Sequence, residues 1–124
     1  MKPKAQETTD AEDKIGKLPR PDTGSIIARS AGLRWVSGES TGFSYKYLFE
    51  DLKSGQSTML MKVEAGAISP PHVHDQLEQI LIMEGDFYDE YSTYELGDFI
   101  VRSPGAKHTG GSKTGALLLL IYSE

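Results

Sequence analysis

Three histidines and one glutamate are the residues of this chain whose spacing could support chemistry. His72 and His74 are separated by a single residue, Glu78 follows four positions after His74, and His108 stands far downstream. Side chains two positions apart on an extended strand project from the same face, so His72 and His74 would point into one space. Glu78 could return to that face if the strand continues, whereas His108 must come from a distant strand. Neutral imidazoles with a carboxylate form a ligand set that suits Fe, Mn, Ni, Zn or Cu.

A structural interpretation of the same residues stands beside the metal hypothesis. A single histidine on a strand commonly serves as a hydrogen-bonded structural residue, and a His-x-His pair alone leaves both interpretations open. Deciding between them depends on the elements that would position the four side chains.

Short apolar or aromatic runs, broken by Gly, Pro, Asp and Ser, predict those elements. The segment Phe43–Phe49 alternates with period two, as expected of a strand with one buried face. Leu117–Leu120 lacks alternation and is predicted to be buried on both faces. Gly110-Gly111 is among the predicted turns. The fold class predicted is all-β, a small antiparallel β-barrel or jelly roll, with strands at Ser25–Arg29, Arg34–Val36, Phe43–Glu50, Ser57–Glu64, Leu77–Phe87, Phe99–Arg102 and Ala116–Tyr122.

Composition restricts the function classes. The chain has 124 residues, which suits one domain. Its net charge of −5 argues against a nucleic-acid partner, which usually requires a basic patch. No apolar run is long enough to span a bilayer and no secretory signal is recognisable, so a membrane partner is not expected. Without cysteine, thiolate ligands, disulfides and cysteine nucleophiles are excluded, and a cytoplasmic location is the default expectation.

The N-terminal residues differ from the rest. Residues 1–22 mix many charges with three prolines and few apolar side chains, so burial cannot repay the entropy of ordering them. We predict a flexible tail over residues 1–22, part of which could dock on a partner subunit, followed by a barrel over residues 23–124.

Two sequence signatures resemble those of the cupin superfamily. The first is Gly66-x5-His72-x-His74-x3-Glu78-x6-Gly85, which fits at every fixed position. The second runs from Gly97-Asp98 to His108. It departs from the usual pattern because Pro104 stands one place late and because Ser112 replaces an asparagine.

The segments 84–90, 96–98 and 102–105 are similar to a narrower cupin branch. That branch contains the cupin domain of ChrR-type anti-sigma factors and dioxygenases that cleave diketones or hydroxyacetophenones. The resemblance implies a single-domain, RmlC-like cupin with one divalent transition metal held by His72, His74, Glu78 and His108. It favours iron, with Zn, Ni or Mn as alternatives, and leaves open whether Glu78 is a ligand or orients a histidine.

Aromatic and sulfur-containing side chains could wall an apolar pocket around such a metal. The candidates share faces of the predicted strands, although they could equally be plain core: Tyr45, Tyr47, Met59, Met61, Ile80 and Tyr122. Tyr122 and Arg102 are weaker candidates than the others. The acidic residues Asp86, Asp89 and Glu90 are interpreted as a solvated hairpin.

Three functions are compatible with this site. The first is an Fe(II)-type dioxygenase acting on a small diketone, hydroxyketone or phenol. The second is a non-redox isomerase, lyase or cyclase that uses Zn, Ni or Mn. The third is a non-catalytic ligand-sensing module, as the ChrR resemblance allows. We also expect a homodimer, because cupins commonly pair through edge strands that otherwise need protection.

Overall fold

The regular secondary structure of the described residues is almost entirely β-strand. A computed structural model describes residues 6–7 and 17–124. Within these ranges there is no α-helix, only a short 3-10 helix at Ser30–Gly32, and no helix could cross a membrane. The strands are β1 (Gln6–Glu7), β2 (Ile26–Ile27), β3 (Val36–Ser37), β4 (Phe43–Glu50), β5 (Ser57–Val63), β6 (Ile68–Val73), β7 (Leu77–Gly85), β8 (Phe87–Tyr88), β9 (Thr93–Tyr94), β10 (Phe99–Arg102), β11 (Lys107–Gly111) and β12 (Ala116–Ser123).

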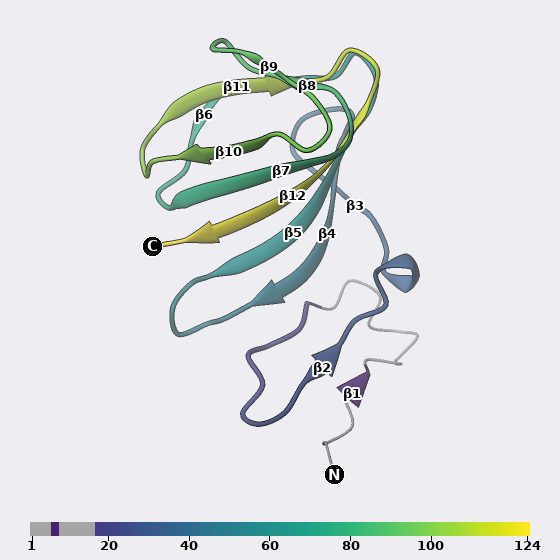
Figure 1. The fold of residues 1–124 in the computed structure, drawn as a ribbon, viewed down its shortest axis with the longest axis vertical. Coiled ribbons are helices and arrows are strands. Elements are labelled where there is room, and N and C mark those ends of the chain that lie inside the picture. The colour runs from purple at the N-terminus through teal and green to yellow at the C-terminus, as the bar shows by residue number, and fades with distance from the viewer. Residues whose placement is uncertain (1–5, 8–16) are drawn as a thin grey trace.

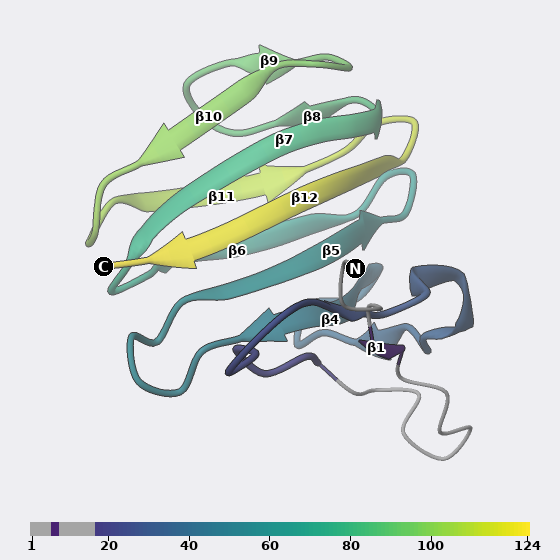
Figure 2. The same cartoon turned by 60° about the horizontal axis from the view of Figure 1, so that its bottom comes forward.

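Two antiparallel sheets face each other. The larger has the strand order β10-β7-β12-β5-β4-β3 and the smaller has the order β6-β11-β8-β9. Figures 1 and 2 show the smaller sheet lying over the upper part of the larger one, with the parallel β1–β2 pair apart from both. This arrangement confirms the predicted antiparallel barrel or jelly roll.

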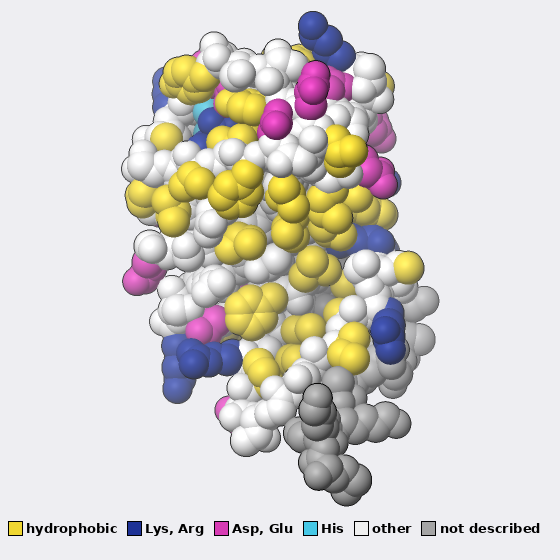
Figure 3. Space-filling model, viewed as in Figure 1, with side chains coloured by type: hydrophobic (Ala, Val, Ile, Leu, Met, Phe, Trp, Pro, Cys, Tyr) yellow, Lys and Arg dark blue, Asp and Glu magenta, His cyan; other side chains and the backbone are white. Residues whose placement is uncertain are grey.

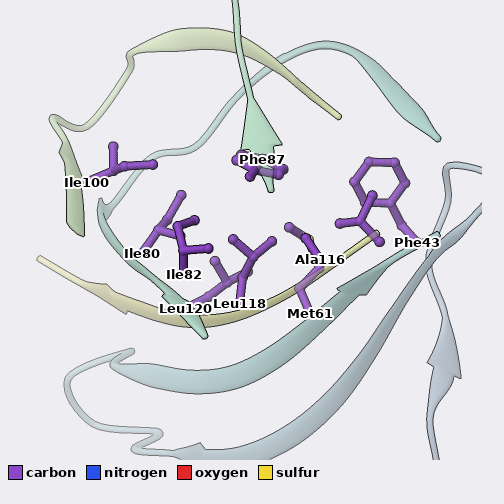
Figure 4. Packing of buried hydrophobic residues seen from close by; sticks show 10 residues of the cluster. Phe43, Met61, Ile80, Ile82, Phe87, Ile100, Ala116, Leu118 and Leu120 are labelled. Carbon is purple, nitrogen blue, oxygen red and sulfur yellow. The ribbon is translucent and has the colours of Figure 1, made fainter. Parts of the chain in front are cut away.

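Alternating side chains of the larger sheet build most of the core. Figure 4 shows the buried apolar side chains reaching into the space between the sheets. Ile80 and Ile82 follow Glu78 inward along β7. On β12, Ala116, Leu118 and Leu120 are buried whereas Leu117 and Leu119 are not, so the prediction that Leu117–Leu120 is buried on both faces is wrong. The core comprises Phe43, Met61, Val63, Ile80, Ile82, Phe87, Ile100, Ala116, Leu118 and Leu120.

In the smaller sheet, β9 and β11 lie outside the strands predicted from the sequence, whereas β6 agrees with the extended strand expected at His72. β6 contains Pro70 and Pro71, which a strand tolerates here because β6 lies at the edge of its sheet. β11 contains Gly110 and Gly111, so the predicted turn at these residues is wrong. A Cβ on Gly110 would lie 2.6 Å from the Phe87 ring, which shows that close packing across the core requires glycine there.

The predicted tail lies mostly outside the described residues, and 17–22 are its largest described part. Leu18 donates its backbone N–H to the Leu48 carbonyl at 2.8 Å and accepts one from Glu50 at 3.0 Å. Lys17 forms an ion pair with Glu50 at 3.0 Å. Residues 17–22 therefore run beside β4.

Candidate metal centre

The three histidines converge at the paired strands β6 and β11. His72 and His108 are direct register partners, and their ring centroids are 4.2 Å apart. His74 follows the last residue of β6, with its ring centroid 5.0 Å from that of His72. One ring nitrogen from each histidine lies within 4.8 Å of the others. The structure thus brings together three of the four predicted ligands.

Backbone carbonyls orient two of these rings. His72 Nδ1 lies 2.9 Å from the Pro70 carbonyl oxygen, and His108 Nδ1 lies 2.9 Å from that of Thr109. A carbonyl can only accept, so each Nδ1 carries the hydrogen and a neutral ring keeps its Nε2 lone pair free. Such hydrogen bonds to the second nitrogen are the usual support of a metal-bound histidine.

His108 provides the test of whether the site fits a metal. Its Nε2 is buried and has no hydrogen-bond partner among the described residues, although buried polar atoms are normally paired. Burial lowers the pKa of both His108 and His74, which favours the neutral form that binds metals. Three imidazoles around one space match the preferences of divalent transition metals.

Glu78 reaches the histidines from the opposite wall. The chain crosses from the smaller to the larger sheet between β6 and β7, so Glu78 approaches on a separate strand and not on a continued β6. Its Oε2 lies 3.4 Å from His74 Nε2, and its Oε1 lies 3.6 Å from His108 Nε2. Both oxygens also have other partners, since Oε1 accepts from Arg102 Nε at 3.1 Å and Oε2 accepts from the Tyr122 hydroxyl at 2.5 Å.

A buried charge network extends from Glu78 through Arg102 to Asp89. Arg102 Nη2 lies 2.8 Å from Asp89 Oδ2, and Asp89 also accepts from the Tyr94 hydroxyl at 2.9 Å. Burial opposes ionisation of Asp89, but the hydrogen bonds from the Tyr91 amide, from Arg102 and from its other donors together lower its pKa. The solvated-hairpin interpretation is therefore wrong for Asp89, which is buried and paired.

Tyr122 is held protonated beside the site. Burial, followed by the charge of Glu78, raises the pKa of Tyr122 well above its usual value. The hydroxyl therefore donates to Glu78 at any ordinary pH. Because Tyr122 is on β12 and Glu78 is on β7, this bond joins neighbouring strands of the larger sheet.

A cavity of about 450 Å³ opens in front of the histidines. Most of the predicted pocket residues line it: Tyr45, Tyr47, Met61, Ile80 and Tyr122. Met59 instead lines a shallower hollow beside His74. The sequence reasoning missed several lining residues, namely Phe43, Phe87, Leu120, Ser69, Gly110 and the loop 37–40.

Comparisons with known proteins agree with this architecture. The family model described as ChrR Cupin-like domain matches residues 23–123. A comparison with curated proteins found no match. Among solved structures, the anti-sigma factor ChrR in complex with SigE from Rhodobacter sphaeroides is similar, with a TM-score of 0.66 and 22% identity. That alignment covers 77% of this chain but only 51% of the other, so this chain spans about half of that one.

Two solved dioxygenase structures are also similar. A putative acetylacetone dioxygenase from Methylibium petroleiphilum gives a TM-score of 0.75 at 16% identity, covering 84% of this chain and 80% of that chain. The acetylacetone dioxygenase of Acinetobacter johnsonii gives 0.70 at 16% identity, covering 87% and 78%. At such identities the similarity establishes a shared fold.

Proposed function

Because this chain belongs to the family of ChrR cupin-like domains, we propose that it is a metal-dependent dioxygenase acting on a small diketone, hydroxyketone or phenol. The observation that carries this proposal is the unpartnered Nε2 of His108, buried beside two further histidines at one end of the cavity. Iron is the metal we favour, since two structural neighbours are named as acetylacetone dioxygenases.

His72, His74 and His108 would hold the metal through a nitrogen each. When bound, iron would supply open coordination positions at which an oxygenated substrate and O2 could meet. Ligation by Glu78 stays a prediction, because Arg102 and Tyr122 compete for its oxygens.

The chain's own residues would position the substrate. Glu78 Oε2 lies beside the histidines and could accept the acidic proton of a diketone or phenol, while the Tyr122 hydroxyl keeps that carboxylate oriented. The apolar wall of Met61, Ile80 and its neighbours would exclude water from the reacting end of the cavity. The volume suits a small ligand.

Elemental analysis of protein purified without chelator tests this function. The wild-type chain should retain a stoichiometric amount of iron, His72→Ala should lose it, and Asp75→Asn should keep it. Asp75 is the matched control because it is exposed and adjacent to His74. Iron-loaded protein should then consume O2 with acetylacetone in a manner that depends on His72. Failure of all three proteins to bind any metal would refute the site.

The same experiment separates the alternatives. Zinc, nickel or manganese with turnover in the absence of O2 would indicate a non-redox isomerase, lyase or cyclase. A similar solved structure is the polyketide cyclase RemF of Streptomyces resistomycificus, with a TM-score of 0.67 at 16% identity over 82% of this chain and 80% of that one. Bound metal without turnover, together with a stoichiometric protein partner, would indicate a sensing module. Homodimer formation and a cytoplasmic location stay predictions.

A further inference from the structure

The outward face of the larger sheet is unusually apolar. Along β10, Ile100 and Arg102 point into the core, while Phe99 and Val101 point outward and are 56% and 57% exposed. Figure 3 shows hydrophobic side chains in a band over the strands that Figure 1 labels β10, β7, β12 and β5. An antiparallel sheet facing water normally alternates apolar inward and polar outward residues, and here most of the outward residues of β10, β7 and β12 are apolar too.

The strand register makes this band continuous. Phe99 pairs with Leu81, Leu81 with Leu119, and Leu119 with Leu60, so one apolar row crosses four strands. Leu117 and Ile121 share the outward face of β12, and Met83 lies exposed on β7. We call these residues the outer apolar face: Leu60, Leu81, Met83, Phe99, Val101, Leu117, Leu119 and Ile121. Contiguous apolar surface with a polar rim marks an interaction site.

Among the described residues, Trp35 covers the neighbouring part of this sheet. Trp35 lies against β4 and β5, with the Lys46 and Lys62 ammonium groups 4.9 and 4.6 Å from its ring centroid. Lys46 is buried and donates to the Ser30 carbonyl at 2.6 Å. The outer apolar face begins beyond this cover and extends to the sheet edge at β10.

Two charged residues at the edge of the outer apolar face indicate which partner could bind there. Lys62 and Glu84 occupy one register row on either side of Leu117, two strands or about 10 Å apart. Within the described part of the chain, neither forms an ion pair. Turning a second copy by 180° about an axis parallel to β12 places its β7 over β5 of the first. Lys62 of each copy then faces Glu84 of the other, so the face is complementary to itself.

We propose that a second copy of this chain packs on the outer apolar face, β12 against β12, about a two-fold axis. The sequence predicts pairing through edge strands; this proposal places the contact on the sheet surface instead. The N-terminal tail is a poor occupant by composition, because residues 1–17 are rich in charge and the face is apolar.

Sedimentation equilibrium of the full chain tests the proposal. The wild type should dimerise reversibly. Leu119→Glu, at the centre of the face, should weaken dimerisation by about 10- to 100-fold, because two carboxylates would meet across the axis. Val101→Glu should weaken it too, and it keeps the fold intact because Val101 is largely exposed. Leu52→Glu is the matched control, since Leu52 is 87% exposed in the β4–β5 turn and should leave the dimer unchanged.

A charge swap tests the two-fold arrangement itself. Lys62→Glu alone should weaken the dimer, and adding Glu84→Lys should restore it, because the charges that face each other across the axis would again be opposite. A wild type that stays monomeric at every concentration would overturn the proposal. The proposal would also be overturned if Leu119→Glu left the dimer unchanged, or if adding Glu84→Lys to Lys62→Glu failed to restore the dimer. A different protein bound to this face would overturn it as well.

Discussion

Replacing Arg102 with glutamine should strongly destabilise the protein, because two buried carboxylates would lose their shared cation. The side chains of Arg102, Glu78 and Asp89 are 8%, 3% and 0% exposed. Breaking a buried ion pair by removing one partner costs about 3–5 kcal/mol. With an unfolding entropy of about 2.1 cal/mol/K per residue over 124 residues, this corresponds to a melting temperature lower by about 10–20 °C.

Urea unfolding with a chelator present, followed through the fluorescence of the single tryptophan Trp35, would measure the loss. Arg20→Gln is the matched control, because Arg20 also pairs with an aspartate but is 72% exposed. An exposed pair contributes about 0–1 kcal/mol. Arg102→Gln with a free energy of unfolding as close to wild type as that of Arg20→Gln would refute the reasoning.

The pH dependence of the stability lost in Arg102→Gln provides a second test. The pKa of Asp89 is lowered in the folded protein, so the stability it contributes is present above the unfolded pKa of 3.8 and is lost as the pH falls through the folded value. The difference between wild type and Arg102→Gln should therefore narrow under acid conditions. A difference that widens as the pH falls would contradict the assigned network.

Three further predictions concern the site and its supports. Glu78→Gln should weaken metal retention by about 10- to 100-fold in a competition titration, whether the carboxylate binds or only orients a histidine; unchanged retention would contradict both roles. The hydrogen bond from the Thr114 hydroxyl is the main cause that lowers the pKa of Asp86 to about 2 in the folded protein. The free energy of unfolding should therefore rise between this pKa and the unfolded pKa of 3.8, and Asp86→Asn should flatten that rise. An unchanged acid unfolding curve would contradict this. Gly110→Ala should cost about 1–3 kcal/mol in urea unfolding because its Cβ would overlap the Phe87 ring, whereas Gly32→Ala, with open space around it, should be close to neutral.

The sequence predicted the parts of this molecule that depend on local pattern. Strands β4 and β10 lie at their predicted bounds, since their alternation is clear. β11 was missed, because glycines that accommodate Phe87 and Tyr88 look like turn residues in a sequence. The extended strand expected at His72 and His74 is β6 as far as Val73, and His74 lies directly after it.

The candidate site, too, was predicted only in part from the sequence. The grouping of the three histidines follows from two-residue spacing and from the resemblance to cupins. The role of Asp89 does not, because its pairing with Arg102 depends on the distance between two sheets. Likewise, the partners of Glu78 lie on two other strands, and no local signal in the sequence connects them.

The placement of the histidines on one sheet has a consequence for how this protein can change. His72 lies on β6, His74 directly follows β6, and His108 lies on β11. Four residues of the larger sheet face them across the cavity: Tyr45, Met61, Ile80 and Tyr122. The three histidines and the residues that face them therefore lie on different strands. Substitutions on the larger sheet that spare Glu78 and its partner Tyr122 would resize the cavity for a new ligand while leaving the three histidines in place, so selectivity could change without loss of the proposed metal.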